Sequence, residues 1–266
     1  MSRPLRQIEV QEVDGLVTVT LARPEAGNAL DRAMAEDLVT VTTMLATSST
    51  ARAVLLRGAG RNFCVGGDIK GFSAAQDEGT LDAYILELVG LFHMAVAGLV
   101  HLDMPVVAAV QGSVAGGGLS LACSCDLVVA GEGTRFVVAY AGIGLTPDGS
   151  ASSVLPRLIG LRRALELTLT NRPLSAREAV DWGLISHVVP DGELDKRARA
   201  LAEELARGPT RALGASKRLL RAGWTEGIDG QLRDEGATIT AMAGTADAKE
   251  GIAAFIEKRP PTFTGH

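Results

Sequence analysis

The stretch FCVGGDIK, residues 63–70, and a second glycine-rich stretch, AGGGLS, residues 115–120, decide the fold of this chain of 266 residues. Each follows a short apolar run, 53–57 or 106–110, and each leads towards a stretch that could be helical. A strand, then glycines, then a helix leaves backbone N–H groups free at the start of the helix. Two such loops can point two N–H donors at one oxygen atom, which is how an oxyanion hole is built. The pattern predicts an α/β protein that stabilises negative charge on a carbonyl oxygen.

The sequence on either side extends this pattern of strands and helices. Residues 8–13 and 16–21 alternate apolar and polar about Asp14-Gly15, which predicts a hairpin. The apolar spacing further predicts helices over 30–45, 81–102, 146–159 and 176–182, and strands over 53–57, 105–110, 127–130 and 136–138. The apolar residues of the 81–102 helix occupy more than one face, so we expect this helix to be well buried.

The character of the sequence changes near residue 190, where Ala-, Arg- and Glu-rich sequence begins and continues almost to Lys258. We therefore predict an α/β core, residues 1–190, and a C-terminal helical region, residues 191–266. The helical region shows no core of its own, so it should pack on the α/β core or on a neighbouring subunit.

Composition and charge argue against several classes of protein. Lys and Arg number 26 and Asp and Glu number 31, so the net charge of −5 disfavours nucleic acid as a partner. Residues 1–6 lack the apolar segment of a secretory signal, and we find no stretch of the roughly 18 apolar residues that span a bilayer. The three cysteines, Cys64, Cys123 and Cys125, lack the spacing of a metal site. We expect a cytoplasmic protein with reduced thiols and no metal.

The two glycine loops, in this order, resemble those of the crotonase (enoyl-CoA hydratase/isomerase) superfamily, and the resemblance runs along nearly the whole chain. It includes RP at 23–24, NAL at 28–30, PVVAAV at 105–110, CDL at 125–127, LSA at 174–176, GLI at 183–185 and FIEKR at 255–259. The resemblance implies a spiral of repeated ββα units with a helical C-terminal region. It also implies assembly as homotrimers or as dimers of trimers through that region.

The resemblance further implies a substrate and a site. The substrate is an acyl-CoA thioester, coenzyme A being part of the substrate and no other cofactor being needed. The thioester enolate would be held by the N–H groups of Gly67, where the family more often has Ala, and of Gly117. The other implied substrate- or CoA-binding positions are Arg23, Ala29, Gly66, Asp68, Ile69, Ser120, Tyr140 and Lys258. In relatives the region around Lys258 sometimes reaches the site of an adjacent subunit.

The chain lacks the two glutamates with which hydratases of this family add water to a double bond. Ser120 and Tyr140 stand at the corresponding positions. Neither is a strong general base near neutral pH, since a tyrosine titrates near pH ~10. This predicts the isomerase-like branch of the family rather than an ordinary hydratase.

The segment YAGIGLTPDG, residues 140–149, offers another acid–base group in Asp148. It resembles family isomerases in which an acidic residue at this position shuttles a proton, and a dehalogenase branch in which it is a nucleophile. An Asp after Pro could equally serve as the N-cap of the predicted helix. We predict that Asp148 carries a proton in an enoyl-CoA isomerase-like reaction; an atypical hydratase and a non-catalytic acyl-CoA binding protein are the alternatives. His93, on the 81–102 helix, could point at the acyl pocket, but a buried, hydrogen-bonded histidine is the commoner case and is the interpretation adopted.

Overall fold

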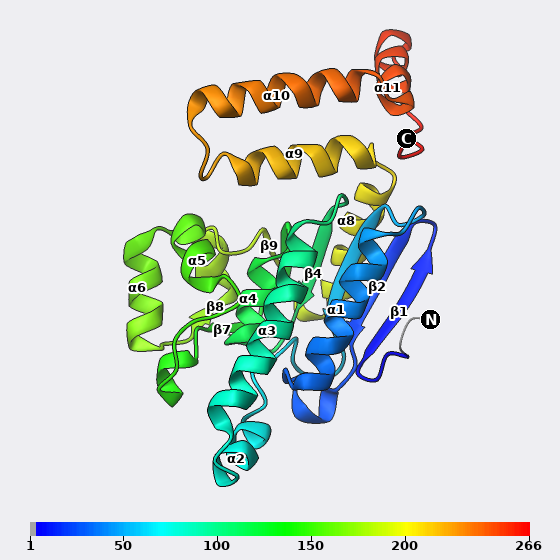
Figure 1. Cartoon of the computed structure of the whole chain (residues 1–266). Helices are drawn as coiled ribbons and strands as arrows, with labels where there is room; N and C mark the ends of the chain where they lie inside the picture. The colour runs from blue at the N-terminus through cyan, green and yellow to red at the C-terminus, as the bar shows by residue number, and fades with distance from the viewer. Residues whose placement is uncertain (1–3) are drawn as a thin grey trace.

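The computed structural model describes residues 4–266; residues 1–3, which belong to the N-terminal stretch considered above, lie outside it. Figure 1 shows an α/β body at one end of which the helices α9, α10 and α11 lie. The chain is thus organised as a sheet-based body followed by the helices α9, α10 and α11.

A six-stranded sheet forms the centre of the body, with strand order β1-β2-β3-β4-β6-β9. All neighbouring strands run parallel except the hairpin β1–β2. The strands are β1 (Ile8–Val13), β2 (Leu16–Leu21), β3 (Ala53–Gly58), β4 (Val106–Val110), β6 (Leu127–Gly131) and β9 (His187–Val189). The predicted hairpin turn is confirmed, because Asp14 and Gly15 both have positive φ, 50° and 79°, as a tight two-residue turn requires.

Three short strands form a second sheet in the order β5-β7-β8. They are β5 (Ser113–Ala115), β7 (Arg135–Val137) and β8 (Leu174–Ser175). β5 follows β4 and β7 follows β6 along the chain, so two successive strands of the main sheet each continue into the second sheet. This repetition of paired strands followed by helices is the ββα spiral that the family resemblance implies.

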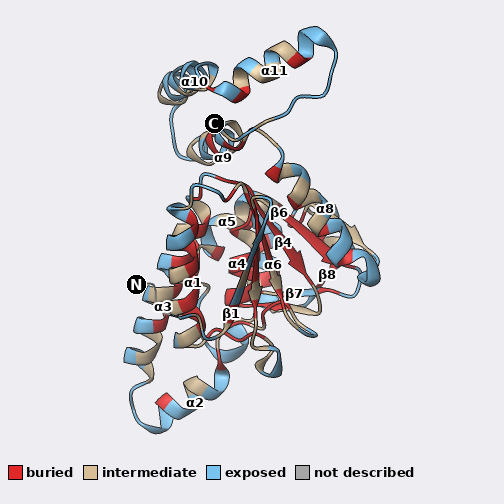
Figure 2. Cartoon of the chain, turned by 90° about the vertical axis from the view of Figure 1, so that its right-hand side faces the viewer, coloured by how far each residue is buried: buried red, intermediate tan, exposed pale blue. Residues whose placement is uncertain are grey.

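Helices cover both faces of the main sheet (Figure 2). α1 (Arg32–Ala46) and α3 (Leu81–Val100) pack on one another and on one face, and α8 (Leu194–Ala206) packs on the other. Along β3, Val54 and Leu56 belong to the first core cluster, whereas Ala53 and Leu55 belong to the second. Both faces of the parallel strands are therefore buried, which explains their continuous apolar sequences.

The other helices connect the strands or come after the last strand in the chain. They are α2 (Ile69–Asp77), α4 (Gly117–Cys123), α5 (Ala151–Ile159), α6 (Leu161–Thr170), α7 (Ala176–Asp181), α9 (Thr210–Ala222), α10 (Ile228–Ala243) and α11 (Ala246–Glu257). The predicted helix over 146–159 begins only at Ala151, because Gly149 and Ser150 take left-handed φ values of 56° and 72°. The sequence pattern did not predict the helix α6.

The helix α3 differs from its prediction in two ways. Its buried residues lie on one face, so the expectation of a well-buried helix is wrong: Leu86 is 75% exposed and Met94 is 60% exposed. By length and composition it could cross a membrane, contrary to the sequence estimate that no stretch is long enough. Phe92, Val96 and Leu99 nevertheless pack into the core of the body, so α3 is the core helix of this fold.

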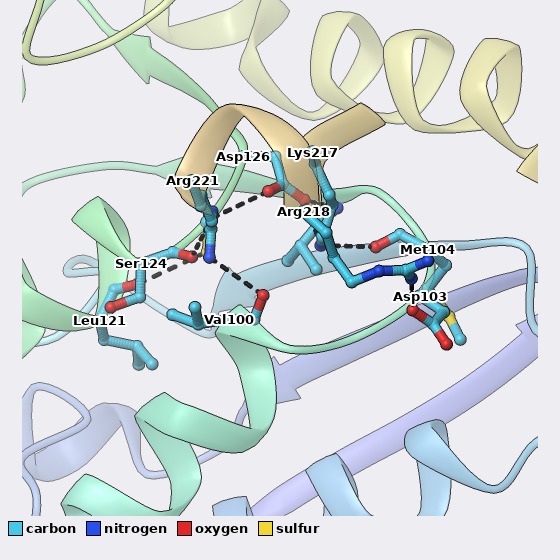
Figure 3. A network of polar contacts seen from close by, with 11 residues as sticks. Val100, Asp103, Met104, Leu121, Ser124, Asp126, Lys217, Arg218 and Arg221 are labelled. Carbon is cyan, nitrogen blue, oxygen red and sulfur yellow. Dashed lines mark hydrogen bonds and ion pairs between the residues drawn. The ribbon is translucent and has the colours of Figure 1, made fainter. Parts of the chain in front are cut away.

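The helix α9 is held to the body by a polar cluster around Asp126 (Figure 3). The Asp126 carboxylate accepts from Lys217 Nζ at 2.8 Å and from Arg221 Nη2 at 2.9 Å. Lys217 also donates to the backbone oxygen of Met104, at 2.8 Å. Burial lowers the pKa of Lys217, and the negative charge of Asp126 opposes that effect. The sequence CDL at 125–127 therefore contributes a structural anchor.

Candidate active site

The two glycine loops border one cavity of about 430 Å³ in the body. Its apolar lining comes from the loops and from α2 and α3, and includes Leu30, Val65, Ile69, Phe72, Ile85, Leu88, Val89, Phe92, Ile143 and Leu145. Gly67, Gly117, Tyr140 and Asp148 also border it. Asp148 is the only carboxylate lining this cavity within residues 4–266.

Backbone hydrogen bonds hold the loops side by side. Ala115 N donates to Cys64 O at 3.0 Å, and Cys64 N donates to Ser113 O at 3.4 Å. Across the described residues, the N–H groups of Gly67 and Gly117 have no hydrogen-bond partner. Both predicted oxyanion donors therefore border one cavity and are free to donate to a bound oxygen.

The glycine at position 67 makes room for an aromatic side chain. A Cβ there would lie 2.6 Å from Cζ of Phe72, well inside van der Waals contact. The Phe72 ring therefore occupies the space that a Cβ at position 67 would take. It also stands edge-on to the Tyr84 ring, with centroids 6.1 Å apart.

Ser120 and Tyr140 both contact Asp148. The Tyr140 hydroxyl donates to Asp148 Oδ1 at 2.5 Å. Ser120 Oγ donates to the Asp148 backbone oxygen at 2.9 Å and lies 3.1 Å from the Tyr140 hydroxyl. Burial and the neighbouring charge of Asp148 raise the pKa of Tyr140 far above its ordinary value, so Tyr140 stays a donor. The two hydroxyls thus hold Asp148 in place, Ser120 at its backbone oxygen and Tyr140 at its carboxylate.

The backbone around Asp148 excludes the N-cap interpretation. The N-cap residue of α5 is Ser150, and the Asp148 side chain instead accepts from Tyr140. Gly149 lies close to α3, because a Cβ on it would stand 2.4 Å from Cε1 of Phe92. The left-handed backbone of Ala139 (φ 67°) and of Ser150 brackets the segment, which is the kind of strain that functional sites carry.

His93 contacts the same segment, and its predicted burial is wrong. Its Nε2 accepts the N–H of Gly149 at 3.0 Å and lies 3.7 Å from Asp148 Oδ2. The His93 side chain is 50% exposed. The sequence spacing does not indicate this contact, because 55 positions separate His93 from Asp148. Only the packing of α3 against the loop brings the two side chains together.

Arg23 and Asp68 form an ion pair beside the glycine loop. Arg23 Nη2 donates to Asp68 Oδ2 at 2.8 Å, and Asp68 Oδ1 accepts from Lys70 N at 3.0 Å as the N-cap of α2. Burial of the Asp68 carboxyl would raise its pKa, but the hydrogen bond and charge of Arg23 and the backbone N–H donors outweigh burial and lower it. Arg23 also lies 3.4 Å from the Ala29 backbone oxygen.

The remaining predicted binding residues separate into two groups. Gly66 and Ile69 border the cavity. Lys258 does not: it follows α11 as its C-cap, with φ 54°, and is not among the residues that line the cavity of its own chain. No group of three or more metal-ligating side chains occurs within residues 4–266.

Comparisons with known proteins agree with this architecture. The enoyl-CoA hydratase/isomerase family matches residues 11–266. A relative named "Probable enoyl-CoA hydratase" from Rhodobacter capsulatus is 37% identical over 254 residues, covering 95% of each chain. The 1,2-epoxyphenylacetyl-CoA isomerase of Escherichia coli is 37% identical, covering 94% of this chain and 95% of its own. The crystal structure of an enoyl-CoA hydratase from Bacillus anthracis superposes with a TM-score of 0.92 at 31% identity, covering 98% of this chain and 100% of that one.

The chain therefore belongs to the enoyl-CoA hydratase/isomerase family, whose fold and motifs the sequence predicts. It is an enzyme of the crotonase superfamily acting on acyl-CoA substrates.

Proposed function

We propose that this enzyme shifts a double bond, or isomerises a ring, in an acyl-CoA thioester, with Asp148 as the proton carrier. The thioester oxygen accepts from the N–H groups of Gly67 and Gly117, and the acyl group enters the apolar cavity. Asp148 removes a proton from one carbon of the acyl group, which forms the enolate, and returns it to another carbon.

One observation carries the proposal: Asp148 is the carboxylate that lines the cavity bordered by both free N–H groups. Each oxyanion donor contributes about 3 kcal/mol to stabilising the enolate. A proton must still be moved, and acid–base catalysis adds about 10²- to 10⁴-fold. Tyr140 keeps its proton and Ser120 is a neutral hydroxyl, so neither replaces the missing glutamates as a base.

The coenzyme A part of the substrate would lie along Arg23, Ala29, Gly66, Asp68 and Ile69, with no further cofactor. Ile69 is 54% exposed at the edge of the cavity, a suitable surface for the pantetheine chain. Lys258 would reach CoA from an adjacent subunit of a homotrimer or a dimer of trimers. A cytoplasmic location is part of the same proposal.

The test is to incubate the purified protein with 2-enoyl-, 3-enoyl- and ring-epoxide CoA thioesters and to identify the products by mass spectrometry. We expect an isomer from the wild type and a loss of turnover of about 100-fold or more in Asp148→Asn. Asp181→Asn, which changes an exposed carboxylate at the end of α7, is the matched control and should keep its activity.

Other products would select the alternatives. Hydrated thioester made by the wild type would identify an atypical hydratase. Retention of thioester without any turnover would identify an acyl-CoA binding protein. A stable mass increment on Asp148 would identify a carboxylate nucleophile, as the covalent reaction of the dehalogenase branch requires.

A further inference from the structure

The two oxygens of the Asp148 carboxylate have different surroundings. Oδ1 accepts the Tyr140 hydroxyl at 2.5 Å, whereas Oδ2 lies 3.7 Å from Nε2 of His93. Tyr140 is buried enough to keep its proton, so Oδ1 is already occupied by a donor. Oδ2 is the oxygen left to take a proton from substrate.

His93 lies beside that oxygen and is more exposed to solvent than Asp148 is. Its side chain is 50% exposed, against 23% for Asp148. Because Nε2 accepts the N–H of Gly149, the proton of the neutral ring lies on Nδ1. An imidazole can take up and release a proton near neutral pH.

We propose that His93 exchanges the proton held by Asp148 with solvent, and so sets how often the proton taken from substrate is replaced before it is returned. This inference rests on the proposed function, in which Asp148 carries that proton. His93 acts through Asp148 and does not touch the substrate, so it is a positioning and exchange residue rather than a catalytic one.

The proton transfers require no reactant other than water. Protonated Asp148 gives its Oδ2 proton to His93 Nε2, which releases the N–H of Gly149. The half-exposed imidazolium then loses this Nε2 proton to water and takes up a solvent proton at the same nitrogen. Return of the solvent-derived proton from Nε2 to Oδ2 restores the neutral ring with its proton on Nδ1. The 3.7 Å separation exceeds the ~2.7–3.2 Å of a formed hydrogen bond, so the side chains must approach before each transfer. Exchange should therefore compete with direct return to substrate, and the product should carry protons from both sources.

The test is turnover of a 3-enoyl-CoA thioester in deuterium oxide by the wild type and by His93→Gln. Mass spectrometry measures the deuterium in the product and in the recovered substrate, each divided by the number of turnovers. Glutamine can accept the N–H of Gly149 through its amide oxygen but cannot relay a proton. We expect deuterium per turnover to fall about tenfold, whatever the change in kcat.

The matched control is His101→Gln, at the end of the same helix, where the ring Nδ1 forms a hydrogen bond with the backbone oxygen of Ala97. It should leave deuterium per turnover unchanged. A second variant, His93→Ala, should lose exchange and regain it when imidazole is added to the solution. This rescue separates proton relay from a purely structural role.

Equal deuterium per turnover in His93→Gln and the wild type would overturn the relay, even if kcat falls. That result would mean that His93 only holds Gly149 in place. If the wild type neither isomerises nor exchanges, the proposed function fails and the relay fails with it. If the wild type forms an isomer that depends on Asp148, but the deuterium content of that isomer is the same in His93→Gln, the relay alone is overturned.

Discussion

At the scale of the residue, Ser120 and Tyr140 share one role, which is to hold Asp148 in place. Each is a poor base, yet both contact Asp148, one at its backbone oxygen and one at its carboxylate. The two hydroxyl groups thus support Asp148, the carboxylate that lines the cavity.

The Tyr140→Phe variant tests this support. Loss of the donor to Asp148 Oδ1 should let the carboxylate turn away from substrate and lower kcat by about 10- to 100-fold, because small misplacements of a reacting group are costly. Steady-state kinetics on the isomerised thioester measures the effect. Tyr84→Phe changes the only other tyrosine, which does not line the cavity, and should keep its kcat. Unchanged kcat in Tyr140→Phe would show that Asp148 is positioned without the hydroxyl.

At the scale of the element, the start of α2 links the glycine loop to the first loop of the chain. Asp68 caps the helix through Lys70 N and pairs with Arg23, so one side chain fixes both the helix and the loop that carries Gly67. The pair is largely buried, with the Asp68 and Arg23 side chains 12% and 21% exposed. An interaction of this kind is expected to contribute more than an open surface ion pair.

Asp68→Asn keeps the helix cap but removes the charge that faces Arg23. We expect a loss of about 1 kcal/mol in the free energy of unfolding near neutral pH. Because folding lowers the pKa of Asp68, the contribution is fully present above the unfolded pKa of about 4 and is lost as the pH falls through the lower folded value. The stability difference between wild type and variant should therefore shrink below pH ~4.

Urea denaturation at several pH values measures that difference. Asp82→Asn, an exposed aspartate in the first turn of α3, is the control and should show a smaller loss. A difference that grows as the pH falls would contradict the assignment of the charge to the Arg23 pair.

At the scale of the whole molecule, polar contacts join α9 to the body, whereas α8 packs on the sheet through apolar residues. Asp126 binds both Lys217 and Arg221 of α9 (Figure 3), and Arg221 also reaches the backbone oxygens of Val100 and Ser124. α10 contains no buried residue. Large exposed apolar side chains are spread over α9, α10 and α11 and the turn between the first two: Leu220, Trp224, Ile228, Leu232, Ile239, Ile252, Phe255 and Ile256.

Asp126→Asn should destabilise the protein by about 3 kcal/mol, because it leaves two cations without their partner. The Lys217 and Asp126 side chains are only 10% and 16% exposed. Asp103→Asn is the matched control: Asp103 pairs with Arg218 of the same helix, but its side chain is 75% exposed, so its loss should cost less than about 1 kcal/mol. Chemical denaturation measures both, and equal costs would refute the distinction between the buried and exposed anchors.

The exposed apolar side chains of α9–α11 fit the proposed assembly into trimers or dimers of trimers. Sedimentation should give a trimer or a hexamer for the wild type, and Phe255→Lys should weaken it, since Phe255 is 87% exposed in the single chain. Lys249→Gln, on the same helix, should leave the assembly unchanged. A wild type that stays monomeric at micromolar concentration would contradict the assembly.

The sequence by itself determined the local elements and the family. Alternation about Asp14-Gly15 predicted the hairpin, and the buried apolar runs predicted β3 and β4. The family resemblance, carried by the two glycine loops and the other motifs, implied the spiral of repeated units. These features are recoverable because turn conformation and periodic burial depend on residues near one another in the chain.

The tertiary structure alone decided how distant residues meet around Asp148. Glycine in left-handed conformation at position 149 delays α5 and directs Asp148 to Tyr140, and the one-sided burial of α3 leaves His93 exposed beside it. Such contacts have no signature in sequence spacing, because they arise only when packing brings separate elements together. The family could therefore be inferred from patterns along the chain, whereas the surroundings of the reacting carboxylate required the fold.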